Sequence, residues 1–190
     1  MNEARQFAAA FDRIGREVLA ELEGIPNEIL HWPLPIPQGC SLFALANQLL
    51  KESEFWVLEV VGGQSLSGYE QSERRIRATF SDLVVCYNQW LAAVHAVLDE
   101  LPDEMMNVFI VLPTAYRQTF GGGPTTVRDC LLHALEQSAL QVGHIQFMCR
   151  LFTDGERVLQ EVVEERDEWE AIGGGESGIR SLYRNPYPLS

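Results

Sequence analysis

The sequence predicts an all-α fold: an antiparallel four-helix bundle with a long crossover containing short extended segments, and an added C-terminal helix. Three observations predict it. Apolar residues recur every three or four positions over four long stretches, which is the period of an amphipathic helix. The stretch before the fourth helix loses that period and is rich in β-branched and aromatic residues. The 190 residues, 46% of them apolar, are enough for one domain with a core.

The first predicted helix covers residues 2–23, and the second begins at Ser41. Gly24 and Pro26 end the first helix, and the four prolines of residues 25–40 exclude a helix or a central strand there, so we expect a loop. Within this loop Trp32 is expected to plug the edge of the core. Ser41 is a suitable N-cap for the second helix, which runs to the glycine pair at residues 62–63.

The third helix is expected over residues 72–101, and residues 105–123 should form one or two short extended segments. The fourth helix then covers 127–152, with Thr125 or Thr126 as its N-cap. Thr153-Asp154-Gly155 is expected to break it, before an acidic fifth helix over 156–172. The predicted organisation is a bundle, 1–152, and an acidic helix and tail, 153–190, packed on the same domain.

Composition and motifs disfavour several classes of function. The net charge of −13 disfavours nucleic acid and anionic membranes as partners, and no apolar run reaches the roughly 18 residues that cross a bilayer. The N-terminal residues lack the apolar core of a signal peptide, so we expect a cytoplasmic protein. The cysteines are widely spaced with no CxxC pair, and the sequence shows no Ser-His-Asp order, HExxH or dinucleotide fingerprint.

The fourth helix carries the chemistry-bearing residues. On a helical wheel its larger apolar residues share one face, and the opposite face holds His133, Gln137, Leu140, Gln141 and His144. That placement favours a solvated or boundary face over a buried site. His133 and His144 are eleven residues apart. This puts them about 16 Å apart along the axis, too far to share one ion.

Two stretches resemble the DinB-like superfamily, which includes YfiT-like thiol transferases and thiol-dependent maleylpyruvate isomerases. They are LLHALEQSALQVGHIQ in the fourth helix and SLFALANQLLKESEFWVLEVVGG in the second, and the resemblance extends over roughly residues 5–152. It implies a site in which three histidines hold one divalent metal such as nickel or zinc. Those positions fall on Gln48, Gln137 and Gln141, which are all glutamine here.

The replacement leads us to expect no metal and no cofactor, because a carboxamide is a weak ligand where imidazole is a good one. Three interpretations stay open: a hydrogen-bonded plug of amides, a pocket for a small polar ligand, or a surviving metal site. Glu52, His133 and His144 are the expected neighbours of the glutamines and the nearest acid–base candidates.

Three functional hypotheses follow. The first is a small-ligand-binding or stress-related homodimer without the family metal site. The second is a metal-dependent transferase or hydrolase acting with a thiol of the glutathione, mycothiol or bacillithiol type. The third is an interaction module that uses residues 153–190, with Trp169, Tyr183 and Tyr187 as anchors. The sequence leaves open whether the protein is an enzyme.

Overall fold

The computed structural model describes residues 2–33, 40–64, 79–112 and 114–171, with the backbone alone at residue 115 and over 153–171. The chain divides into two compact units, residues 1–149 and 150–190. The first unit contains the bundle and every contact described below. Among the described residues no helix is long and apolar enough to cross a membrane.

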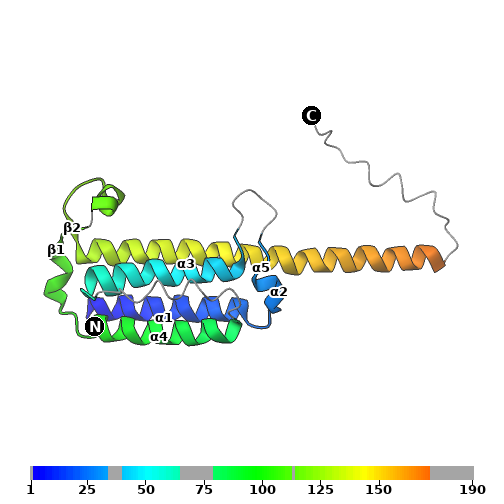
Figure 1. The fold of residues 1–190 in the computed structure, drawn as a ribbon, viewed down its shortest axis with the longest axis horizontal. Helices are drawn as coiled ribbons and strands as arrows, with labels where there is room; N and C mark the ends of the chain where they lie inside the picture. Colours follow the sequence, from blue (N-terminus) through cyan, green and yellow to red (C-terminus); the bar gives the residue numbers. More distant parts are fainter. Residues whose placement is uncertain (1, 34–39, 65–78, 113, 172–190) are drawn as a thin grey trace. The chain divides into compact units, whose positions relative to one another are not determined.

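The bundle is built from α1 (Glu3–Leu22), α3 (Leu42–Glu54), α4 (Phe80–Leu98) and the first part of α5 (Val127–Ala171). The all-α prediction is confirmed (Figure 1). Helix α1 is antiparallel to α4, and α3 with its continuation η1 is antiparallel to α5. Helices α1 and α5 run in the same direction, because Arg128 bonds to Glu3 while Gln146 bonds to Glu17.

Helix starts follow the capping residues of the sequence. The Asn2 side chain accepts from the Ala4 amide, and the Ser41 side chain accepts from the Ala44 amide, which confirms the predicted cap at Ser41. Thr79 and Asp82 form a reciprocal capping box at the start of α4. Residues 72–78, which were expected to belong to this helix, lie outside the described residues.

The second predicted helix is not uniform. After Glu54 the α-helix widens into a π-helix, η1 (Phe55–Val61), which ends at Gly62 as expected. Gly63 follows with φ of 63°, a left-handed conformation that glycine adopts without steric cost. A π segment turns the side chains after it relative to an α-helix, and such segments are frequent at functional sites.

Helices α1 and α4 pack closely around Trp90. A Cβ built at Gly15 would lie 3.1 Å from the Trp90 ring, so glycine permits this approach. The rings of Phe11 and Tyr87 meet Trp90 edge-on. The Tyr87 hydroxyl donates to the Ala46 carbonyl at 2.9 Å and ties α4 to α3, and burial raises the pKa of that phenol.

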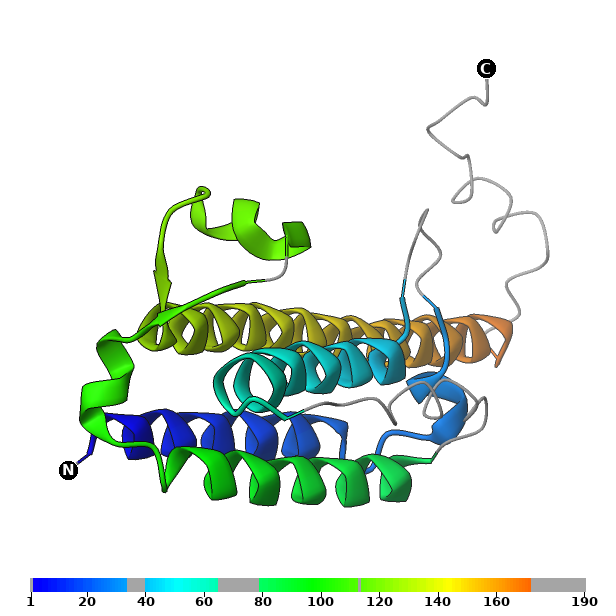
Figure 2. The ribbon, with the colours of Figure 1, turned by 60° about the vertical axis from the view of Figure 1, so that its left-hand side comes forward.

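The segment between α4 and α5 lies at the end of the bundle where α1 begins (Figure 2). It contains η3 (Asp103–Asn107), β1 (Phe109–Ile110), η4 (Thr114–Phe120) and β2 (Thr125–Thr126). The strands pair antiparallel, with Phe109 opposite Thr126. Short extended segments were predicted here and are present, but the 3₁₀ helices η3 and η4 were not predicted.

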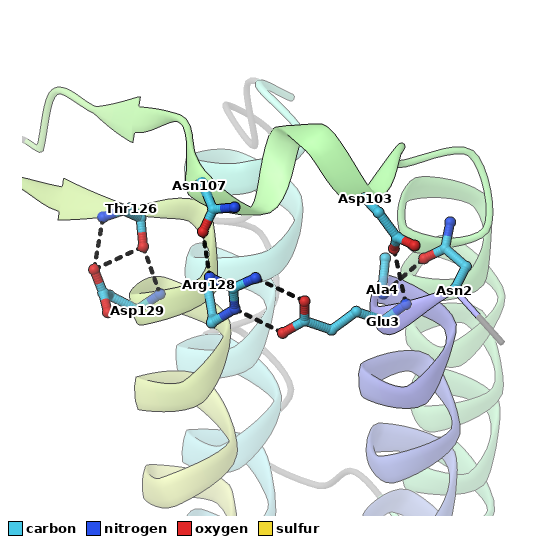
Figure 3. A network of polar contacts seen from close by, with 8 residues as sticks. All are labelled: Asn2, Glu3, Ala4, Asp103, Asn107, Thr126, Arg128 and Asp129. Atoms are coloured by element: carbon cyan, nitrogen blue, oxygen red, sulfur yellow. Dashed lines mark hydrogen bonds and ion pairs between the residues drawn. The ribbon is translucent and has the colours of Figure 1, made fainter.

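A polar clasp closes this end of the bundle (Figure 3). The Arg128 guanidinium donates to both carboxylate oxygens of Glu3 at 2.7 Å and also to Asn107, which joins α5, α1 and η3. These bonds hold the pKa of Glu3 below its ordinary value. Thr126 and Asp129 cap α5 reciprocally, and the Thr126 bonds lower the pKa of Asp129.

Three local predictions are wrong. Residues 25–40 are not all loop, because Asn27–Leu30 form the single-turn helix α2. Trp32 is 57% exposed and does not plug the core. Helix α5 does not break at Thr153-Asp154-Gly155 but continues to Ala171. The reason is that glycine costs only about 1 kcal/mol inside a helix and, unlike proline, removes no backbone donor. Residues 172–190 lie outside the described part of the chain.

Candidate functional site

Gln141 occupies a core position of α5. Seven of the buried residues of α5 follow alternating steps of four and three along the helix: Val127, Leu131, Ala134, Ser138, Gln141, Ile145 and Met148. Gln141 is 5% exposed. The helical wheel had placed it opposite the core, because that assignment followed the larger apolar residues of the helix. The small residues Ala134 and Ser138 mark the true seam, and they add little to an apolar pattern.

The carboxylate of Glu52 on α3 joins two of the three predicted glutamines. Its Oε2 accepts from Gln141 Nε2 at 2.6 Å, and its Oε1 accepts from Gln48 Nε2 at 3.0 Å. Gln48 is exposed and lies one helical turn before Glu52, whereas Gln141 reaches it from the neighbouring helix. The strong bond of this pair is therefore the interhelical one, because an ionised acceptor and partial burial both strengthen it.

The other end of the Gln141 amide has no partner. Its Oε1 is buried and meets no hydrogen-bond donor among the described residues. Exchanging the oxygen and nitrogen of the amide would place the carbonyl oxygen against the Glu52 carboxylate, so the hydrogen-bond pattern fixes this orientation. An unsatisfied buried acceptor costs about 1–3 kcal/mol. The amide is thus held by one bond and leaves an acceptor unused.

A cleft of about 500 Å³ opens beside this carboxylate. It lies among α3, η1, η4 and α5, and it is lined by Lys51, Glu52, Phe55, Trp56, Tyr116, Thr119, His133 and Gln137. Of the predicted site residues, Glu52, His133 and Gln137 line the cleft. Gln48 and Gln141 are connected to it through Glu52. His144 is exposed on α5 and is not part of the lining.

One wall of the cleft is aromatic and centres on Trp56. The Trp56 ring lies 5.0 Å from Phe55, 5.5 Å from Tyr116 and 5.0 Å from His133, measured between ring centroids, and each pair is edge-on. Trp56 itself is buried, while Tyr116 is exposed. These rings were not predicted to belong to a site. The Phe55-Trp56 pair directly after Glu52 was the available signal, but Tyr116 sits on a 3₁₀ helix with no periodicity to reveal it.

The residues present do not fit the metal that the resemblance implies. Within the described ranges no three His, Cys, Asp or Glu side chains gather to hold an ion. Both oxygens of Glu52 already accept from amides, and the ring of His133 packs against Trp56 and Phe120. Nickel and zinc prefer imidazole and thiolate, and amides are poor substitutes. No chemical step is therefore assigned to a metal here.

The helix arrangement defines the fold, which is that of a DinB-like helical bundle. A DinB-like protein from Bacillus subtilis superposes with a TM-score of 0.58 at 18% identity, over 78% of this chain and 92% of that one. A conserved protein from Enterococcus faecalis gives a TM-score of 0.62 at 14% identity, over 80% and 97%. At such identities the likeness shows the fold alone. No protein-family profile and no curated protein matches the sequence.

Proposed function

We propose that the protein binds a small polar ligand in the cleft beside Glu52 and that it does so without the metal typical of its fold family. The observation that carries the proposal is the Glu52 carboxylate, fixed by amides from two helices and lining a cleft with an aromatic wall. A few fixed polar groups beside apolar and aromatic walls are typical of small-molecule sites.

The cleft chemistry suits a ligand with a planar ring and N–H donors. A carboxylate has about four lone-pair positions, and the two glutamines use two of them, so Glu52 can accept further hydrogen bonds. The Gln137 amide lines the same space and can donate or accept. A ring can pack against Tyr116 and Phe55, since Tyr116 is exposed and Phe55 is half-buried.

Benzamidine is a probe that combines a ring with paired N–H donors. We expect it to raise the melting temperature of the protein and to change tryptophan fluorescence, with an apparent Kd in the micromolar to millimolar range. Benzoate, which has a similar ring but no donor, should bind at least about tenfold more weakly. Glu52→Gln should lose the preference for benzamidine, because the neutral amide no longer offers an ionised acceptor.

Glu59→Gln is the matched control, since Glu59 is an exposed glutamate on η1 outside the cleft lining. It should bind benzamidine as the wild type does. Equal binding of benzamidine and benzoate, or equal loss in both variants, would show that Glu52 does not select the ligand.

Independence from metal has its own test. Nickel or zinc added at equimolar concentration should leave the melting temperature unchanged, because the amides and the engaged carboxylate provide too few strong ligands. A stoichiometric stabilisation by either metal would refute this part of the proposal. It would favour the alternative, a metal-dependent thiol transferase or hydrolase, which no observation on the described residues supports.

The homodimer expected from the sequence is part of the same proposal, as is a stress-related role in the cytoplasm. The earlier hypothesis placed the contact in residues 153–190, whose side chains lie outside the described set. Removing these residues should convert a dimer to a monomer if that hypothesis is correct, and mass measurement by light scattering would decide it.

A further inference from the structure

The outward side of α5 between residues 132 and 147 is unusually apolar for a solvated helix. It comprises six exposed residues, which we call the α5 outer face: Leu132, Glu136, Ala139, Leu140, Gly143 and Phe147. Leu132 is 44% exposed, Leu140 55% and Phe147 60%. One of the six is charged, in a chain with 27 acidic and 14 basic residues.

The outward side of α1 shows what a solvated face of this protein looks like. Its exposed residues include Arg5, Arg13, Arg16 and Glu17. Arg16 even forms an ion pair with Asp12 one turn away. Contiguous exposed apolar side chains of the α5 kind mark interaction sites more often than solvated surface.

The spacing of its residues allows the α5 outer face to pair with a second copy of itself. A twofold axis placed between Ala139 and Leu140, with two copies of the helix antiparallel, sets Leu132 opposite Phe147 and Ala139 opposite Leu140. It also sets Glu136 opposite Gly143, and a Cβ built at Gly143 would meet nothing within 4 Å. Each residue of one copy thus faces a residue of the other copy that faces it in return, as an isologous interface requires.

The same arrangement is complementary in charge and hydrogen bonding. His144 is exposed beside Gly143, and the twofold axis brings it within about 1.5 Å of Glu136 of the partner copy along the helix direction. An imidazole N–H can donate to that carboxylate, and symmetry provides the contact twice. The face's single acid therefore gains a partner instead of opposing another acid.

We propose that the α5 outer face is the surface through which two copies of this chain associate, with the two α5 helices antiparallel. This deepens the proposed homodimer by placing its contact on α5 between residues 132 and 147 instead of in residues 153–190, and it does not depend on the ligand of the cleft. Residues 132–147 span about 22 Å of helix. A contact of that length is smaller than the standard interface of about 1,600 Å². The dimer should therefore be weak and concentration-dependent.

Sedimentation velocity over a range of protein concentrations tests the proposal. The wild type should shift from monomer to dimer, and Leu140→Glu should remain a monomer throughout, because it places two carboxylates near the axis. Val85→Glu is the matched control, since Val85 is 53% exposed on α4. It should dimerise like the wild type. Circular dichroism and melting temperature would establish that both variants are folded.

A cross-linking experiment tests the direction of pairing. Leu132→Cys and Phe147→Cys chains, mixed and treated with a short bismaleimide, should cross-link more than either chain alone, with untreated wild-type cysteines as the background. A wild type that stays monomeric, a dimer unaffected by Leu140→Glu, or stronger cross-linking within one variant than in the mixture would overturn the proposal. Benzamidine binding by Leu140→Glu should be unchanged, so failure here is distinguishable from failure of the cleft.

Discussion

The amides of Gln48 and Gln141 bond to the same carboxylate from very different surroundings, which makes them a matched pair for mutation. Gln48 is exposed on the helix that carries Glu52. Gln141 is 5% exposed and reaches Glu52 from α5. Replacing each by alanine removes one hydrogen bond from Glu52. Because the acceptor is the same, a difference in the free energy of unfolding between the two variants reflects the surroundings of the glutamine.

The two alanine variants should differ in how much free energy of unfolding they lose. Gln141→Ala loses a hydrogen bond to a charged group, about 1.5–3 kcal/mol, and regains about 1–3 kcal/mol because the unsatisfied carbonyl also disappears. It further loses one buried methylene, Cγ, at about 0.8 kcal/mol. The expected net loss is about 1–2 kcal/mol. Gln48→Ala removes an exposed pair one helical turn apart, which contributes about 0.2–0.5 kcal/mol.

Gln141→Leu provides the complementary measurement. It places an apolar side chain of similar size at this core position, and it removes the unsatisfied oxygen together with the hydrogen bond. The two polar effects then nearly cancel, so we expect a change within about 0.5 kcal/mol of the wild type.

Urea unfolding followed by circular dichroism would measure these free energies. For a domain of this size each kcal/mol corresponds to about 2–4 °C in melting temperature. In a Glu52→Ala background the effect of Gln141→Ala should fall by about 1–2 kcal/mol, which is the coupling energy of the pair. The reasoning is refuted if Gln48→Ala costs as much as Gln141→Ala, or if the double-mutant cycle shows no coupling.

Three further predictions concern the bundle itself. Gly15→Ala should lower stability by up to about 2 kcal/mol in urea unfolding, because crowding against Trp90 outweighs the gain of about 1 kcal/mol in helix propensity; an increase in stability would show that the ring moves aside. Tyr87→Phe should cost about 1 kcal/mol by the same assay through loss of its buried hydrogen bond, and a neutral result would contradict that. Glu3 and Asp129 have lowered pKa values in the folded state, so their stabilisation is present at neutral pH and is lost as the pH falls below about 4. The melting temperature of Asp129→Asn should accordingly fall less between pH 7 and pH 3 than that of the wild type, and parallel curves would argue against this linkage.

Helix starts were readable from the sequence because their determinants are local. The cap at Ser41 depends on residues within one turn, and the same holds for Thr126 with Asp129. The π-helix at Phe55–Val61 was not predicted, because its residues are compatible with an α-helix and only packing distinguishes the two. The continuation of α5 through Gly155 was missed since a single glycine weakens a helix without preventing it.

The candidate site was partly predictable. The resemblance drew attention to Gln48, Gln137 and Gln141, and the structure connects two of them through Glu52. The burial of Gln141 could not be read from hydropathy, since a glutamine in a core seam has the same pattern as one in solvent. The contribution of Tyr116 depends on how η4 folds back over the bundle, which no local signal in the sequence indicates.

The clasp between Glu3 and Arg128 has a consequence for synthesis of the chain. Its two residues are separated by 125 positions. At roughly 5–20 residues per second on the ribosome, the start of α1 waits roughly 6–25 s before its partner has been made. Helices α1, α3 and α4 can associate in that interval, but the end of the bundle cannot close. A nascent chain that stalls before Arg128 would thus lack the contact that joins α1 to α5, and this end of the bundle could close only after α5 has been made.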